Sequence, residues 1–134
     1  MYIAKEVDLI DARAYLKQLN LDYIVESMCS NMYPLPRWTL SDAGHCCHLY
    51  KNFLLLQKIH ITEPLVPTRE IDEFWHNHIL YTKQYIHDCM NIFGRYLHHA
   101  PADPNEDSKH ILDQYNKTKV YYLQEFNVPL TLKK

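Results

Sequence analysis

The chain has 134 residues, of which 47% are hydrophobic and only two are glycine, and its formal net charge at pH 7 is −2. This length suits one domain with a core of its own, and the hydrophobic fraction excludes a disordered chain. No lysine and arginine patch stands out and no apolar run is long enough to cross a bilayer, so we expect neither a nucleic acid nor a membrane as a partner.

Apolar residues recur at helical spacing along most of the chain, which predicts an all-α fold, a single compact bundle of five or six helices. The expected helices span about residues 8–20, 20–32, 39–60, 68–81, 82–93 and 106–126. Residues that can cap a helix precede four of them: Asp8, Thr39 or Ser41, Thr68 and Thr82. Residues 1–134 are expected to form one helical domain, with 127–134 as a loose C-terminal tail.

The third expected helix should lie at the centre of the bundle, because its apolar stripe is wide enough to be buried on most sides. Proline residues at 34 and 36 should end the second helix. Gly94 is well placed to end the fifth helix in a left-handed conformation, and an extended or 3₁₀ passage should follow over residues 95–101.

The four cysteines predict a reducing compartment rather than a disulfide framework. Cys46 and Cys47 are adjacent, which suits a set of disulfides poorly, and free thiols are typical of cytoplasmic proteins. The N-terminal residues lack a basic start followed by an apolar run, so we expect no secretory signal. The expected location is therefore the cytoplasm, either of the producing cell or of a cell into which the protein is delivered.

Residues 67–101 hold most of the histidines and one cysteine, which makes them the candidate centre for metal chemistry. Zinc and iron are bound by imidazole, thiolate and carboxylate groups, and a site needs three or four that converge. On a helix, residues two apart diverge by about 200°. At most one of His76 and His78 can therefore serve a given site.

An inward set of ligands would combine His78 and Cys89 with His98 or His99, because His78 falls on the apolar face of its helix. A histidine on such a face can equally be a core residue whose ring nitrogens are satisfied by neighbours. A third alternative is a catalytic pair, with Cys89 as nucleophile and His78 or His98 as base. The apolar surroundings of Cys89 would raise its pKa and weaken it as a nucleophile.

A lateral set would combine Asp72 and His76, which lie four residues apart on one flank of the helix, with a later histidine. Asp72 could equally orient His76 without touching the ion, or form a simple surface pair with it. Together the two sets predict one transition metal ion, zinc or iron, or none, with the candidate ligands His76, His78, Cys89 and His98 and the supporting Asp72.

A second histidine and cysteine cluster occurs at residues 45–48, His-Cys-Cys-His. On a helix, the adjacent Cys46 and Cys47 point about 100° apart and cannot both converge with the two histidines. Small buried thiols are the simpler interpretation of this run.

Residues 67–99, PTREIDEFWHNHILYTKQYIHDCMNIFGRYLHH, resemble the core signature of the glycine-rich-domain-containing-protein-like family. In that family an aspartate precedes a Trp-His-x-His run, a tyrosine and an Asp-Cys pair follow, and a glycine and a histidine-containing end close the motif. The matching positions are Asp72, Trp75, His76, His78, Tyr85, Asp88, Cys89, Gly94, His98 and His99. The resemblance implies no specific activity, and it covers the helical domain alone because the sequence has no glycine-rich region.

The favoured function is that of a small non-catalytic interaction or regulatory protein. Such a protein would act as an inhibitor or adaptor that binds another protein, for example a larger enzyme, and could itself form a homodimer. The small size, the lack of a convincing catalytic set and the eleven tyrosines favour this interpretation. A structural metal ion at the histidine-rich centre is compatible with it. The candidate contact residues are Tyr96, His99 and Tyr121, together with Tyr2 and Tyr33.

Two other classes of function remain open. The first is a metal-dependent enzyme, a hydrolase or a non-haem iron oxygenase, that uses the same histidine and cysteine cluster and keeps an open position on the ion. The second is a redox or pH sensor built on Cys46, Cys47 and Cys89 or on the histidines.

Overall fold

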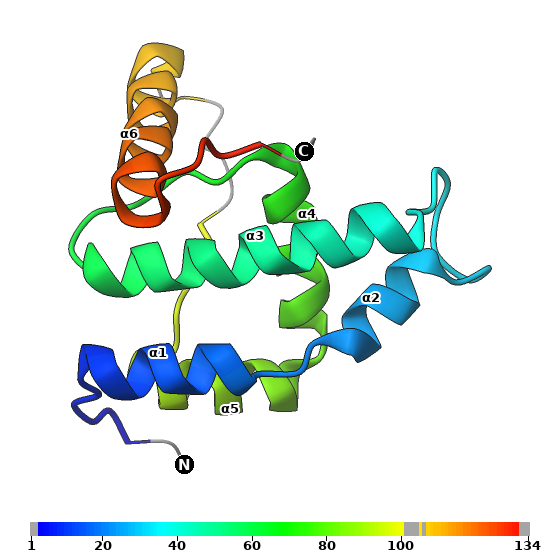
Figure 1. Cartoon of the computed structure of the whole chain (residues 1–134), viewed down its shortest axis with the longest axis horizontal. Helices are drawn as coiled ribbons and strands as arrows, with labels where there is room; N and C mark the ends of the chain where they lie inside the picture. The colour runs from blue at the N-terminus through cyan, green and yellow to red at the C-terminus, as the bar shows by residue number, and fades with distance from the viewer. Residues whose placement is uncertain (1–2, 101–104, 106, 132–134) are drawn as a thin grey trace.

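The computed structural model describes residues 3–100, 105 and 107–131, and these fold into six α-helices without any strand (Figure 1). The helices are α1 (Leu9–Gln18), α2 (Asp22–Cys29), α3 (Leu40–Ile59), α4 (Arg69–Leu80), α5 (Thr82–Ile92) and α6 (Ser108–Phe126). The predicted all-α bundle is confirmed. Tyr2, most of the expected 101–107 loop and the last three residues of the expected tail lie outside the described residues. Among the described helices, none has both the length and the apolar character that a membrane crossing requires.

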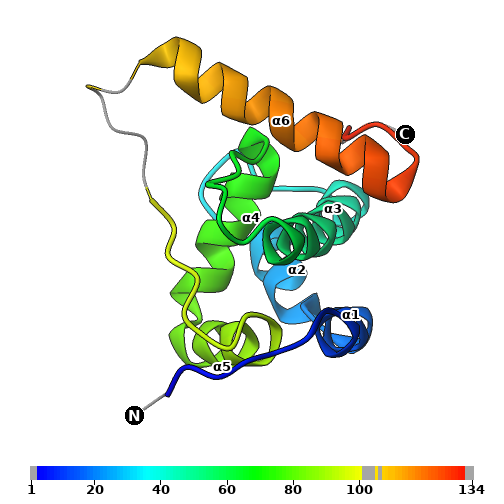
Figure 2. The same ribbon diagram turned by 90° about the vertical axis from the view of Figure 1, so that its left-hand side faces the viewer.

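α3 is the central helix, as the sequence predicts. It contacts α1, α2, α4 and α6, and Figure 2 views it almost along its axis with these helices around it. Its buried residues occur on most sides of the helix: Ala43, Cys46, Leu49, Tyr50, Phe53, Leu54, Leu55, Leu56 and Gln57. A helix with this distribution must be covered all round, and its neighbours satisfy that requirement.

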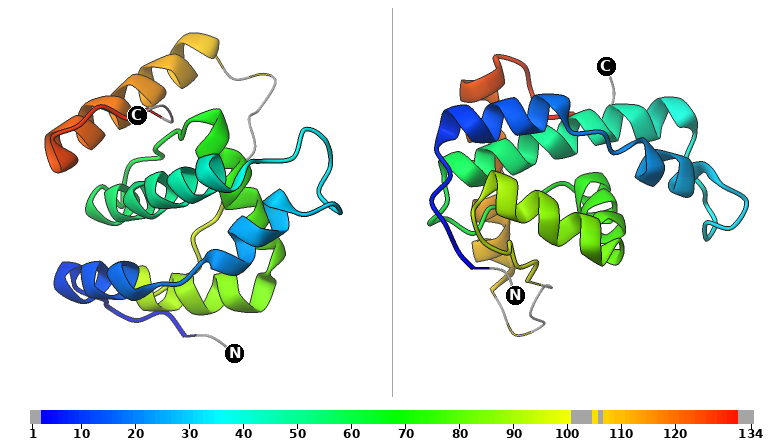
Figure 3. Two further views of the ribbon diagram at one scale, coloured as in Figure 1. Left: turned by 45° about the vertical axis from the view of Figure 1, so that its right-hand side comes forward. Right: turned by 90° about the horizontal axis from the view of Figure 1, so that it is seen from below.

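The helices around α3 form two layers. α6 lies on one side of α3, and α1 and α5 lie next to each other on the opposite side (Figure 3). α6 is held mainly through its second half, where Thr118 and Tyr122 are buried and Asn52 Nδ2 donates to Tyr122 Oη at 2.9 Å. The first half of α6 and residues 64–67 of the connection between α3 and α4 both line the cavity described below.

Local capping accounts for several helix ends. The side chains of Asp8, Thr39 and Thr68 accept hydrogen bonds from the backbone three residues further on, at 2.8, 3.1 and 3.1 Å, as predicted. The prediction that Thr82 caps α5 is wrong. Tyr81 occupies the capping position and Thr82 is the first residue of the helix, because only one residue separates α4 from α5.

α2 ends at Cys29, earlier than the predicted end near residue 32, and before the prolines at 34 and 36. Ser30 adopts an extended conformation and its hydroxyl donates to the Ser27 carbonyl at 2.8 Å, in competition with the helical pattern. The backbone N–H of Trp38, from the following loop, donates to the Met28 carbonyl at 3.0 Å. The helix therefore stops where the loop supplies alternative partners.

A chain of buried hydrogen bonds connects four helices in the core. His78 on α4 places Nδ1 2.7 Å from Tyr50 Oη on α3 and Nε2 2.8 Å from an Asp88 oxygen on α5. The other Asp88 oxygen accepts from Tyr15 Oη on α1 at 2.6 Å. Burial raises the pKa of Tyr50 well above its usual value, so its hydroxyl stays uncharged. The polar groups of this chain are tolerated in the core because each of them is paired with another.

Gly94 follows α5 with φ 72°, in the left-handed conformation that the sequence predicts. The backbone N–H of Lys5 donates to the Gly94 carbonyl at 2.8 Å, which pins the N-terminal segment across the end of α5. A Cβ at position 94 would overlap the carbonyl oxygen of Lys5. Any residue with a side chain is thus disfavoured here both by its backbone conformation and by its surroundings.

We expect Gly94→Ala to lower the free energy of unfolding by about 1–3 kcal/mol, because it combines a positive φ with the overlap on Lys5. Gly44→Ala is the matched control, since Gly44 lies within α3 and an added Cβ there meets nothing within 4 Å. That change should raise stability by up to about 1 kcal/mol. Urea denaturation of both variants checks the pair, and equal effects would contradict the role given to Gly94.

We expect Tyr50→Phe to lower the free energy of unfolding by about 1–3 kcal/mol, because it leaves the buried Nδ1 of His78 without its partner. Tyr96→Phe at the surface removes the same hydroxyl group and should change stability by less than about 0.5 kcal/mol. The measurement is thermal or chemical denaturation of both variants. A Tyr50→Phe variant as stable as the Tyr96→Phe variant would show that the buried chain contributes nothing.

Candidate metal centre

Asp72 and His76 lie one turn apart on a solvent-facing flank of α4. His76 Nε2 is 3.8 Å from one oxygen of Asp72, and the two side chains are 57% and 37% exposed. His78, two residues further along, points into the core and is 1% exposed. The two histidines thus diverge, as the helical geometry predicts.

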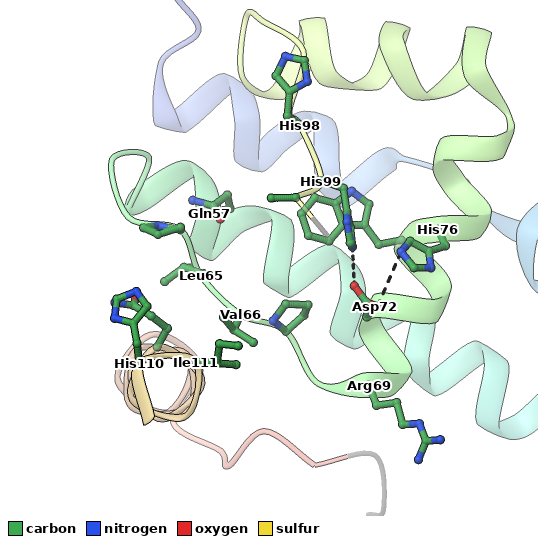
Figure 4. A pocket seen from close by; sticks show the side chains of 15 residues that line it. Gln57, Leu65, Val66, Arg69, Asp72, His76, His98, His99, His110 and Ile111 are labelled. Atoms are coloured by element: carbon green, nitrogen blue, oxygen red, sulfur yellow. Dashed lines mark hydrogen bonds and ion pairs between the residues drawn. The ribbon is translucent and has the colours of Figure 1, made fainter. Parts of the chain in front are cut away.

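His99 adds a third group from the irregular segment 96–100 that follows α5 (Figure 4). Its Nε2 is 2.5 Å from the second oxygen of Asp72, and its side chain is 12% exposed. The imidazole ring packs edge-on against the indole of Trp75, with 4.2 Å between the ring centroids, and lies 4.5 Å from the ring of His76. His99 is therefore held against α4 by three side chains of that helix.

Tyr85 on α5 fixes the segment that carries His99. Its hydroxyl donates to the Leu97 carbonyl at 2.6 Å and accepts from Trp75 Nε1 at 2.9 Å. Burial raises the pKa of Tyr85, so the hydroxyl stays protonated and able to make both bonds. Since Leu97 precedes His99 by two residues, this hydrogen bond sets how His99 approaches Asp72.

Asp72, His76 and His99 place one carboxylate oxygen and two imidazole nitrogens within 4.8 Å of one another. Within residues 3–100, 105 and 107–131, no other group of three or more such side chains converges in this way. Bonds of about 2.0–2.2 Å to zinc put neighbouring ligand atoms roughly 3–3.5 Å apart. The exposed ring of His76 has room to rotate toward the other two groups and so shorten the distances between the ligand atoms.

This group lies at one end of a cavity of about 460 Å³. Figure 4 shows the cavity between the connection from α3 to α4, α4 itself, the segment with His98 and His99, and α6. Its apolar wall consists of Pro64, Leu65, Val66, Pro67, Trp75, Ala100 and Ile111. This volume and this mixture of apolar and polar lining are typical of pockets that bind small molecules.

The predicted inward ligands are not gathered at one point. Both ring nitrogens of His78 are engaged in the core, so neither is left for an ion or for a role as a base toward Cys89. Cys89 is buried, and this burial raises the pKa of its thiol. His98 is exposed, lines the cavity, and packs edge-on against the ring of Tyr96.

The run at 45–48 does not converge either. The thiol of Cys46 lies 3.3 Å from the Glu70 carbonyl, to which it donates, and burial raises its pKa to about 12. His45 Nε2 is 3.2 Å from the carbonyl of Thr131, and the rings of His45 and His48 are 6.5 Å apart. The simpler interpretation of this run, small thiols in a helix, fits these contacts.

The tyrosines proposed as partner contacts make bonds within the chain. Tyr33 Oη donates to Glu73 at 2.6 Å, and Tyr121 Oη donates to Glu63 at 2.7 Å. Tyr96 is exposed, and its ring packs edge-on against Tyr85. A role for any of them in binding another protein stays a prediction.

The sequence pairs Asp72 with His76, but the predicted ligand list included His98 and gave His99 only as a partner contact. The structure brings His99, and not His98, to this pair. A signal for it was present in the segment itself. Residues two apart in an extended segment face the same side, and the apolar Leu97 marks the inward side that His99 shares. The wall contributed by α6 had no signal in the sequence, because it depends on how distant segments pack.

A model of the UCP032817-like family matches residues 12–119. Glycine-rich domain-containing protein 1 of Arabidopsis thaliana is 32% identical over 82 residues, which cover 58% of this chain and 10% of that protein. The match thus spans about a tenth of the length of this curated relative. No solved structure matches the chain.

The expected resemblance to glycine-rich-domain-containing proteins is confirmed by these two findings. The printed name of the relative states no activity, so the comparisons assign none. The family match begins within α1, ends within α6 and includes the whole of the Trp-His-x-His motif. The chain therefore belongs to the UCP032817-like family.

Proposed function

We propose that this protein binds one divalent transition metal ion through Asp72, His76 and His99 and uses it as an enzyme on a small molecule in the adjacent cavity. One observation carries the proposal: three ligand atoms of suitable type lie within 4.8 Å of one another at the wall of the cavity. The proposal corresponds to the lateral ligand set and to the metal-dependent enzyme of the sequence analysis.

The donor set supports catalysis better than a purely structural role. Structural zinc sites are usually closed by four protein ligands, whereas catalytic sites use three and leave room for water or substrate. Two imidazoles and one carboxylate form the set found in zinc hydrolases and in non-haem iron oxygenases. All three residues line the cavity, so a ligand in the cavity would lie next to a metal ion that they held, which supports chemistry on a bound ligand.

The electrostatic surroundings also suit a metal cation. The carboxylate of Asp72 offers a different oxygen to each histidine, so both rings have a nitrogen directed toward the same negative charge. Trp75 covers one side of His99 and reduces its access to solvent. A ligand that is oriented by packing and hydrogen bonds, as His99 is, binds a metal ion more tightly than a flexible one.

The interaction and regulator interpretation has less support than the metal interpretation. Of its candidate contacts, Tyr33 and Tyr121 are engaged with glutamates of the same chain, and His99 belongs to the ligand group. Binding of another protein therefore ranks second here, behind metal-dependent catalysis.

Protein purified without a histidine tag should bind about one equivalent of Zn²⁺ or Fe²⁺, measured by elemental analysis and calorimetry. His76→Ala should weaken binding by more than about tenfold, because it removes one of three ligands. Its effect on the stability of the metal-free protein should stay below about 0.5 kcal/mol, since His76 is largely exposed. Asp72→Ala and His99→Ala should also lose the ion.

His87→Ala is the matched control for these variants, because His87 is an exposed helical histidine outside the ligand group. It should leave the stoichiometry and affinity unchanged. Less than about a tenth of an equivalent of any transition metal in the wild-type protein, or equal losses in His76→Ala and His87→Ala, would rule out the proposed site.

The thiols should be poorly reactive in the folded protein, which bears on the sensor alternative. Cys46 and Cys89 are buried, and burial raises the pKa of both thiols and that of Cys47, to about 11 in the last case. In a Cys29→Ala, Cys47→Ala double variant, we expect almost no reaction with a disulfide reagent at neutral pH and two reactive thiols after unfolding. Two rapidly reacting thiols in the folded double variant would favour the redox sensor instead.

A further inference from the structure

The cavity next to the ligand group has two chemically different ends (Figure 4). Asp72, His76 and His99 form one end. Leu65, Val66 and Ile111 lie toward the other, where the connection from α3 to α4 meets α6. His110 and Gln57 also line this second end, beside Ile111 and Leu65. An apolar body that extends from the ligand group into the cavity would contact the three apolar side chains there.

The charges around the cavity favour an anion at the polar end. The described lining of the cavity includes one acidic side chain, Asp72, and one basic side chain, Arg69. A divalent ion bound by two neutral imidazoles and one carboxylate leaves a net positive charge there. Partial exclusion of water by Trp75 strengthens the attraction of this charge for an anion.

We propose that the cavity binds a small carboxylate with an apolar body, whose carboxylate group occupies the open positions of the metal ion. This inference rests on the proposed metal function. Carboxylate oxygens are good ligands of zinc and iron, and the apolar body would remove Leu65, Val66 and Ile111 from water. A cavity of about 460 Å³ accommodates a ligand of roughly a dozen non-hydrogen atoms.

The far end of the cavity is set by contacts that hold α6 against the connection from α3 to α4. Tyr121 Oη and Lys117 Nζ on α6 both contact the carboxylate of Glu63, at 2.7 and 3.2 Å. Thr118, two turns after Ile111, is completely buried. These contacts keep Ile111 beside Leu65, so the cavity has a defined length and should select the size of the apolar body.

Calorimetry of the Zn²⁺-loaded protein with hexanoate, acetate and hexanamide tests the inference. Hexanoate should bind about 10- to 100-fold more tightly than acetate, because four additional methylene groups are buried. It should also bind at least about tenfold more tightly than hexanamide, which has the same shape but no charge. Removal of the zinc with a chelator should abolish the binding of hexanoate.

Ile111→Trp fills the apolar end and should reduce the affinity for hexanoate to that for acetate, with zinc stoichiometry and acetate affinity unchanged. Unchanged zinc uptake shows that the variant is folded. Leu112→Trp is the matched control, because Leu112 is the next residue of α6, is exposed and does not line the cavity. It should leave hexanoate binding as in the wild-type protein.

The outcomes separate this inference from the proposed function. If zinc binds but hexanoate binds no more tightly than acetate or hexanamide, the carboxylate inference is overturned and the metal site stands. The same holds if hexanoate binding is insensitive to Ile111→Trp. If the wild-type protein binds no zinc or iron, both proposals fail together.

Discussion

The hydrogen bonds of His78 fix the rotation of α4 about its axis, and the candidate metal centre depends on that rotation. Tyr50 and Asp88 hold the two ring nitrogens from opposite sides, and Tyr15 completes the pairing of Asp88. Because a helix turns by about 100° per residue, an inward His78 places Asp72 and His76 on a flank that faces solvent. A rotation of α4 that released His78 would also remove this pair from His99.

The two kinds of residue in the signature motif have separate tasks. His78, Asp88, Tyr85 and Gly94 build the fold through buried hydrogen bonds and a left-handed turn. The ligand group of Asp72, His76 and His99 lies outside this buried network and lines the cavity. The motif therefore contains both residues that stabilise the fold and residues that line the cavity. The first kind fixes the positions of the second.

The helices could be predicted from the sequence because their determinants are local. The broad apolar stripe of α3 and the caps at Asp8, Thr39 and Thr68 are visible in short windows of residues. The end of α2 could not be predicted, since Trp38 from the following loop decides it. The pairing of Asp72 with His76 could likewise be predicted, because it follows from helical spacing. The position of His99 and the cavity wall on α6 could not, because they depend on tertiary packing.

The bond between Lys5 and Gly94 closes a loop that contains five of the six helices. Joining such distant residues costs more chain entropy than forming a helical pair, so it must follow the packing of the intervening helices. Gly94 begins the passage that leads to His99. Asp72 and His76 share one turn of α4, whereas His99 reaches them through the turn at Gly94 that Lys5 contacts, so the N-terminal segment takes part in placing the third group.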